Sequence, residues 1–236
     1  MKQSKYFLLT VMVIVSLLVL FAHAQNTQQE SREFNPKTVK IGDQTWMAEN
    51  LNVTTFRNGD SIPEARTNEE WKKAGEEGKP VWCYYNNNSE KGEIYGKLFN
   101  WYAVNDPRNL APEGWHVATD EEWKKLEMYL GMSQLEADSI RWRGTNEGGK
   151  LKEIGTTHWS KPNTGAVNEI GFFALPGGLR FGNGLFYFMG DFAGFWTATE
   201  GRSGLALYRS FSNKHSGITR DDYNKNHGFS VRLVRD

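Results

Sequence analysis

Residues 119–125 read TDEEWKK and residues 67–73 read TNEEWKK, so two stretches of the chain differ at a single position. In each, a threonine stands just before a helical pattern and a glutamate follows three residues later. This is a capping box, in which the hydroxyl accepts a hydrogen bond from the third backbone N–H and the carboxylate accepts one from the cap's own N–H. Thr67 and Thr119 are therefore predicted to begin helices. Because the flanking sequences do not match, the similarity is shared capping chemistry rather than a repeat, and one domain is expected.

The helix after Thr119 is expected to be the better formed of the two. Its core-facing residues recur at helical spacing: Trp123, Leu126 and Leu130. Gly131 is expected to end it. In the first copy the apolar stripe ends in AGEEGK (74–79), which leaves barely two turns. Ser133 with Glu136 forms a third capping box.

The N-terminal half of this domain contains two predicted strand segments. In residues 38–47, Val39 and Ile41 alternate with polar residues, and Gly42-Asp43 is typical of a tight hairpin turn. Residues 80–86, PVWCYYN, are apolar on both faces, as expected of a buried strand.

The C-terminal third is predicted to be antiparallel β-structure. One hairpin is expected across Gly182-Asn183-Gly184 and another across residues 201–204, GRSG. Residues 213–228 are polar and predict a loop. In the final segment, alternate residues are expected to share a face: Phe229, Val231 and Leu233 on one side, Ser230 and Arg232 on the other.

The N-terminus has the pattern of a signal peptide over residues 1–24. Lysines precede an apolar run from Tyr6 to Phe21, and the small residues of Ala22-His23-Ala24 suit cleavage. An uncleaved anchor is the alternative, although the run is short for a membrane span. Residues 25–37 are polar and without periodicity, so we expect a flexible linker, with the domain over 38–236. The mature chain is thus expected to be exported, with no stable membrane span.

Charge and cysteine content exclude several classes of function. The chain has 28 basic and 28 acidic residues, which gives no electrostatic basis for binding nucleic acid. Its one cysteine, Cys83, cannot form an internal disulfide and is expected to be a buried small hydrophobe rather than a nucleophile.

No metal or catalytic motif is evident. The histidines lack metal-ligand spacing, and His116 is expected to be a satisfied structural group rather than a base. Residues 168–172 and 219–224 are rich in oxygen ligands and could hold calcium, but solvated loops are the preferred interpretation, so no cofactor is predicted.

Aromatic side chains beside polar groups predict a binding face, because sugar rings stack on aromatic faces while amides and carboxylates bind the hydroxyls. Six residues in one polar and aromatic part of the sequence are the candidates: Trp159, Asn168, Glu169, Arg180, Asp191 and Trp196. The alternative is that the tryptophans fill the core of a loop-rich fold.

Six ordered blocks carry a family resemblance: VKIGDQTWMAENLNV (39–53), GKLFNWYAV (96–104), APEGWHVATDEEWKKL (111–126), NEIGFFALPGGLR (168–180), FWTATE (195–200) and HGFSVRLVRD (227–236). Together they resemble the Fibrobacter succinogenes major paralogous domain family of exported bacterial proteins of unknown activity. That family is similar to the C-type-lectin-like fold of the formylglycine-generating enzymes. The resemblance implies one loop-rich α+β domain of antiparallel hairpins, with two short flanking helices and paired N- and C-terminal strands.

The chain departs from these relatives at the positions that carry chemistry. Ala111 and Leu233 stand where family members often have cysteines, and if those pair in the family, the two residues should here form an apolar contact. With Cys83 alone, the copper-binding cysteine pair of the formylglycine-generating enzymes is absent. The calcium-dependent sugar motifs of animal lectins are also missing, since KPN (161–163) and VNE (167–169) lack their key residues.

The expected function is therefore an exported, non-catalytic module that binds a glycan or a cell-envelope partner through a loop-rich face. One alternative is an enzyme or enzyme remnant that uses Glu169 or Asp191 with Arg180; a carboxylate with a raised pKa in a pocket would favour it. The other is a structural surface protein, which a large exposed apolar patch would favour.

Overall fold

The computed structural model describes residues 34–236, of which Pro36–Asp236 form one unit. The predicted signal peptide and the predicted linker up to residue 33 lie outside the described residues. Within residues 34–236, no helix is both long and apolar enough to cross a membrane.

A four-stranded antiparallel sheet joins the two ends of this unit. The predicted N-terminal hairpin is present as β1 (Thr38–Ile41) and β2 (Gln44–Met47). The strand order is β1-β2-β13-β5, with β13 at Leu233–Arg235 and β5 at Trp115–Val117. The N- and C-terminal segments therefore pair, but through β2 rather than β1.

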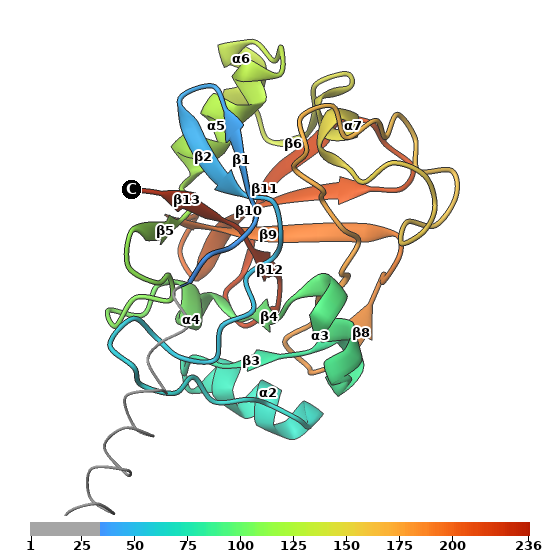
Figure 1. Cartoon of the computed structure of the whole chain (residues 1–236). Coiled ribbons are helices and arrows are strands. Elements are labelled where there is room, and N and C mark those ends of the chain that lie inside the picture. Colours follow the sequence, from blue (N-terminus) through green and yellow to red (C-terminus); the bar gives the residue numbers. More distant parts are fainter. Residues whose placement is uncertain (1–33) are drawn as a thin grey trace, which may run out of the picture. The chain divides into compact units, whose positions relative to one another are not determined.

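The largest sheet has five strands in the order β12-β9-β10-β11-β6 (Figure 1). Its bounds are Ser230–Val231 (β12), Phe192–Glu200 (β9), Leu205–Ser212 (β10), Ile218–Asn224 (β11) and Arg141–Arg143 (β6). β9 and β10 confirm the predicted hairpin across residues 201–204. The predicted loop over residues 213–228 is wrong in part, because β11 pairs with both β10 and β6 there.

Two short antiparallel pairs complete the β-structure. The predicted strand over residues 80–86 is reduced to β3 (Trp82–Cys83), which pairs with β4 (Leu98–Phe99). The hairpin across Gly182-Asn183-Gly184 joins β7 (Leu179–Arg180) to β8 (Phe186–Tyr187).

All three predicted capping boxes are present at the starts of α2 (Asn68–Glu76), α5 (Asp120–Tyr129) and α6 (Gln134–Asp138). Within residues 34–236 there are six α-helices rather than two. The others are α3 (Ser89–Tyr95), α4 (Trp101–Val104) and α7 (Glu147–Leu151), together with a 3₁₀ turn, η1 (Tyr85–Asn87). These short segments lack the apolar periodicity that a longer amphipathic helix shows.

The hydrophobic core is divided into two clusters. The larger includes Trp123 of α5, whose ring packs against Trp46 of β2 at 4.9 Å and Phe172 at 5.7 Å between ring centroids. The smaller includes Trp71 of α2 and Cys83 of β3. Figure 1 shows α5 and α6 at one end of the unit, and α2 and β3 at the other.

In the final segment, both predicted faces are buried. Ser230 and Arg232 are buried like the apolar residues beside them. Arg232 donates to the backbone oxygens of Met47, Phe172 and Phe173 and to Asn50 Oδ1. These acceptors satisfy the buried guanidinium, so an arginine can occupy a core position. Ala111 and Leu233 are both buried, and their mutual contact stays a prediction.

Candidate functional site

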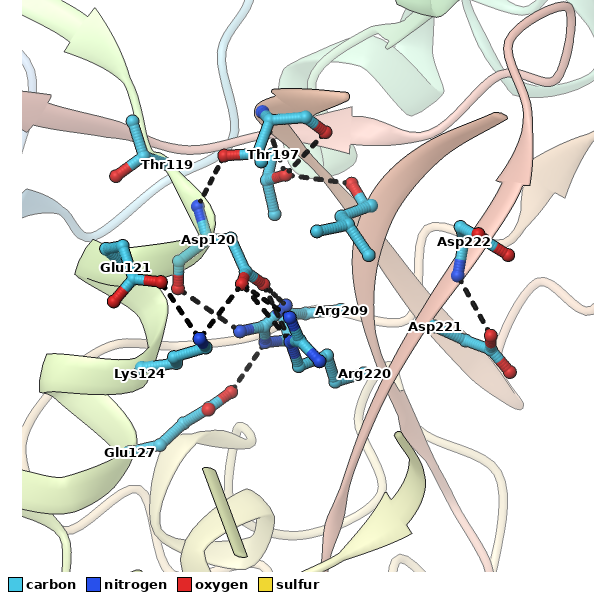
Figure 2. A network of polar contacts seen from close by, with 12 residues as sticks. Thr119, Asp120, Glu121, Lys124, Glu127, Thr197, Arg209, Arg220, Asp221 and Asp222 are labelled. Atoms are coloured by element: carbon cyan, nitrogen blue, oxygen red, sulfur yellow. Dashed lines mark hydrogen bonds and ion pairs between the residues drawn. The ribbon is translucent and has the colours of Figure 1, made fainter. Parts of the chain in front are cut away.

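The densest group of ionisable side chains lies between α5 and the five-stranded sheet (Figure 2). Asp120 of α5 accepts from Arg209 at 2.7 Å and from Arg220 at 2.8 Å. Glu127, two turns further along the same face of α5, accepts from Arg209 and from Arg143, each at 2.7 Å. We call Asp120, Glu127, Arg143, Arg209 and Arg220 the ion network.

Every charge of the ion network has a partner of opposite sign, and its three cations and two anions are balanced when Lys124, Glu121 and Asp138 beside it are included. Burial alone would raise the pKa of Asp120, but the guanidinium groups of Arg220 and Arg209 hold it well below its usual range. Lys124 lies 3.5 Å from Asp120 and also contacts two carboxylates nearer the surface, those of Glu121 and Asp138. Because each charge has a partner of opposite sign, the network's evident role is to hold α5 against the sheet rather than to react.

The two stretches that could hold calcium do not gather ligands. Asp221 and Asp222 lie on β11, apart from the ion network (Figure 2), and Asp222 is engaged by Arg202 at 2.6 Å. Asn168 accepts from the backbone N–H of Phe173. In the part of the chain that the structure describes, no group of three acidic, histidine or cysteine residues could hold a metal ion.

Three of the six candidate binding residues are interior residues. Trp159 and Trp196 are 1% and 0% exposed, and their indole N–H groups donate to the backbone oxygens of Ala174 and Phe99. Arg180 is also fully buried. Their rings and guanidinium cannot contact a ligand in this structure, so the core-filling alternative describes both tryptophans.

The other three candidates reach the surface but do not form a group with Arg180. Glu169 is exposed and lies 4.0 Å from Lys150. Asp191 is exposed and accepts from Asn213. Within residues 34–236, no carboxylate lies at ion-pair distance from Arg180, so the suggested pairing of Glu169 or Asp191 with it is not formed.

Two adjacent hollows at the α2 and β3 end instead combine aromatic and polar side chains. The first, of about 460 Å³, is called the hairpin hollow and is lined by Asn68, Asn86, Asn87, Leu185, Phe186 and Tyr187. The second, of about 590 Å³, is called the tryptophan hollow and is lined by Glu64, Arg66, Trp82, Tyr84, Asn87 and Ser89. Asn87 lines both, and both volumes suit small ligands.

The turn that carries Asn87 is built by consecutive asparagines. Asn86 and Asn87 have φ of 54° and 53°, a left-handed conformation that asparagine tolerates better than most residues. The Asn87 amide donates to the backbone oxygen of Arg66 at 2.7 Å. Its carbonyl end remains available to a ligand as an acceptor.

In the tryptophan hollow, hydrogen bonds and ring packing hold the aromatic side chains of Trp82 and Tyr84 in place. The Trp82 indole N–H donates to the Ile62 backbone oxygen at 2.8 Å, and its ring packs edge-on against Tyr84. Lys97 donates to the Tyr84 hydroxyl at 3.2 Å. Glu64 accepts from Arg66 at 2.9 Å.

The hairpin hollow depends on a close approach of the β7–β8 turn to α2. Gly184 has φ of 90°, and a Cβ there would lie 2.5 Å from the Asn68 Cα, so only glycine fits. Tyr85 of η1 packs on Phe186 with ring centroids 5.1 Å apart.

Arg180 holds these walls together rather than meeting a ligand. It donates to the backbone oxygens of Ala65, Thr67 and Gly184 at 2.8–2.9 Å. Its guanidinium also lies 4.6 Å from the centre of the Phe186 ring. The sequence did not show that this arginine is buried, and sequence reasoning missed the hollows although the NNN run at 86–88 is a turn signal.

Two other side chains that could in principle react, Cys83 and His116, are buried or hydrogen-bonded within the protein. Burial raises the pKa of the Cys83 thiol to about 12, so it is a poor nucleophile, and its burial confirms the prediction of a structural role. His116 lies 2.6 Å from both Glu122 and Asp236, as expected of a satisfied structural group.

One comparison with known proteins gives a match. The family model described as the Fibrobacter succinogenes major domain matches residues 39–235. No curated protein and no solved structure matches the chain.

Proposed function

The chain belongs to the Fibrobacter succinogenes major domain family, and from this premise we propose that it is an exported, non-catalytic module that binds a glycan through the hollows around Asn87. The observation that carries the proposal is the pairing of aromatic rings with amide and carboxylate groups in two adjoining hollows. Sugars need both, because their C–H faces pack on rings while their hydroxyls exchange hydrogen bonds with polar groups.

The fold and the leader support the proposal. Paired terminal strands, short helices and long loops suit a C-type-lectin-like arrangement, whose loops would carry the ligand. Residues 1–24 have the pattern of a signal peptide, so the binding surface would meet glycans of the cell envelope or outside it. Amino-terminal sequencing of the exported protein tests the leader, and a mature start at Gln25 is expected.

The chemistry of the described clusters favours binding over catalysis. The charges of the ion network are paired with opposite charges, and Cys83 is buried with a raised pKa. A catalytic carboxylate would instead be expected in a pocket with its pKa raised towards neutrality.

The test is a glycan-array screen of residues 25–236, run with calcium and with a chelator. We expect a hit that does not need calcium and is weakened at least tenfold by Asn87→Ala or Tyr187→Ala. Tyr129→Ala is the matched control, because Tyr129 is also an exposed tyrosine but lies on α5. Equal losses in Tyr129→Ala and Tyr187→Ala would refute the assignment of the site.

An envelope protein is the second candidate partner. Leu185, Tyr187 and Phe188 are exposed side by side at the β8 hairpin, and contiguous exposed apolar groups favour protein contact. A blank glycan array together with specific capture of an envelope protein, lost in Tyr187→Ala, would favour this partner.

A further inference from the structure

A buried cation lies against the two aromatic rings that line the tryptophan hollow. Lys97 is 2% exposed, and its ammonium lies 4.5 Å from the centre of the Trp82 ring and 4.7 Å from that of Tyr84. It donates to the Asn52 backbone oxygen at 3.1 Å, to Asn52 Oδ1 and to the Tyr84 hydroxyl. Both rings line the hollow, so the charge lies directly behind its wall.

This cation has no carboxylate partner. Among the described residues, no acidic oxygen lies within ion-pair distance of Lys97, although Glu64 is near enough to act on its charge. Glu64 is itself paired with Arg66 at 2.8 Å. Glu70, which does not line the hollow, accepts from the backbone N–H groups of Arg66 and Thr67 at the start of α2. Glu64 and Arg66, the two charged residues that line the hollow, cancel each other, so the unpaired charge beside it is that of Lys97.

Two residues that line the tryptophan hollow, Tyr84 and Arg66, have hydrogen-bond donors that are not used within the described part of the protein. Since Lys97 donates to the Tyr84 oxygen, the hydroxyl proton is directed elsewhere, and it has no acceptor among the described residues. Arg66 is exposed and uses Nε and one terminal nitrogen on Glu64, which leaves the other terminal nitrogen unused. Donors beside an unpaired cation favour an anionic acceptor.

We propose that the tryptophan hollow selects acidic glycans, whose carboxylate or sulfate group accepts from Tyr84 and Arg66 in the field of Lys97. The inference rests on the proposed function and adds the charge of the ligand to it. Burial lowers the pKa of Lys97 to about 8, so the ammonium still carries its charge at neutral pH.

Lys152 offers a matched comparison elsewhere in the molecule. It is also buried, it has no carboxylate partner within ion-pair distance in the described part of the chain, and burial lowers its pKa to about 8 as well. Its ammonium donates to the backbone oxygens of Thr164, Ser212 and His215, each at 2.9 Å, and it lines neither hollow. A lysine of this kind affects folding without affecting ligand choice.

The experiment measures affinities of the exported chain for three oligosaccharides of equal length. These are an oligogalacturonate, a sulfated oligogalactan and a neutral cello-oligosaccharide. We expect at least one acidic oligosaccharide to bind tenfold or more tightly than the neutral one, with a preference that falls as salt rises. The two acidic ligands distinguish carboxylate from sulfate recognition.

Variants then assign the preference to the hollow. Lys97→Met, which retains the side-chain length, should remove most of the preference, measured as the ratio of acidic to neutral affinity. Arg66→Gln, at an exposed position that cannot disturb the core, should reduce the same preference. Lys152→Met should leave the ratio of acidic to neutral affinity unchanged.

The results would show whether the preference for acidic ligands alone is wrong or the proposed glycan binding is wrong as well. Equal affinity for acidic and neutral ligands, or a preference that survives both Lys97→Met and Arg66→Gln, would overturn the inference while the proposed glycan binding stands. No binding to any glycan, on the array or in solution, would overturn both.

Discussion

Cations are buried in two different ways at the two ends of this molecule. At the α5 end, the guanidinium groups of Arg209, Arg220 and Arg143 are paired with Asp120 and Glu127. At the α2 and β3 end, Lys97 and Arg180 have no carboxylate partner among the described residues and are held by backbone oxygens and aromatic rings.

The difference separates a structural role from a binding role. A buried ion pair cancels its own field, so it orients elements but offers little to a ligand. A buried cation without a counter-ion keeps its field, and beside a surface hollow that field is available to an anion. Arg180 shows the limit of the rule, because its three carbonyl acceptors make it a part of the wall.

The largest effect is expected from breaking the ion network. Asp120→Asn removes the negative charge that pairs with buried Arg209 and half-buried Arg220, so the free energy of unfolding should fall by about 3–5 kcal/mol. Urea denaturation measures this loss. Glu121→Gln is the control, because Glu121 is an exposed partner of Lys124 on the same helix and should cost less than about 1 kcal/mol. Equal losses of stability in the two variants would show that the buried ion pairs of Asp120 stabilise the fold no more than the exposed ion pair of Glu121.

A smaller effect on stability is expected at the other end. Lys97→Met removes a cation that burial already disfavours, and water can replace its bonds to Asn52, which is exposed. We therefore expect a loss of no more than about 1 kcal/mol in urea denaturation, against a clear change in ligand preference. A loss as large as that of Asp120→Asn would show that Lys97 is as much a part of the fold as the ion network.

The smallest effect concerns pH and the start of α5. Hydrogen bonding to Glu122, with a further contribution from Asp236, raises the pKa of His116 to about 9. The stabilisation of the folded state by protonated His116 should be fully present below pH 6.5, the usual pKa of histidine, and should be lost as the pH rises through 9. The effect should stay below about 1 kcal/mol, because the side chain is 37% exposed.

His116→Gln provides the reference for this measurement. The difference in melting temperature between wild type and variant should shrink between pH 6 and pH 10. Lys97 and Lys152, whose lowered pKa values act in the opposite direction, are common to both proteins and cancel in the difference. A difference that does not change with pH would show that His116 stabilises α5 without its charge.

Features governed by neighbours in the sequence could be predicted well. Thr67, Thr119 and Ser133 begin helices as expected, because a capping box is complete within four residues. The hairpin at Gly42-Asp43 is equally local, since its turn residues decide the pairing.

Prediction failed where the environment of a residue is supplied by distant segments. The polar sequence of β11 indicated a loop, yet its neighbours β10 and β6 supply hydrogen bonds on both sides. Arg232 was placed on a polar face, although four acceptors from remote residues allow it to be buried. Trp196 and Arg180 were chosen as binding residues because their burial depends on contacts that the sequence does not display.

By itself, the sequence determined the starts of α2, α5 and α6, most of the hairpins and the family, because each can be recognised from patterns of side chains along the chain. Only the tertiary structure decided which charged residues are compensated and which face a hollow. The reason is physical: whether a cation is paired depends on what long-range folding brings within a few ångströms of it. Lys97 and Lys152 are the same residue with similar burial, and only their distant neighbours give one of them a hollow.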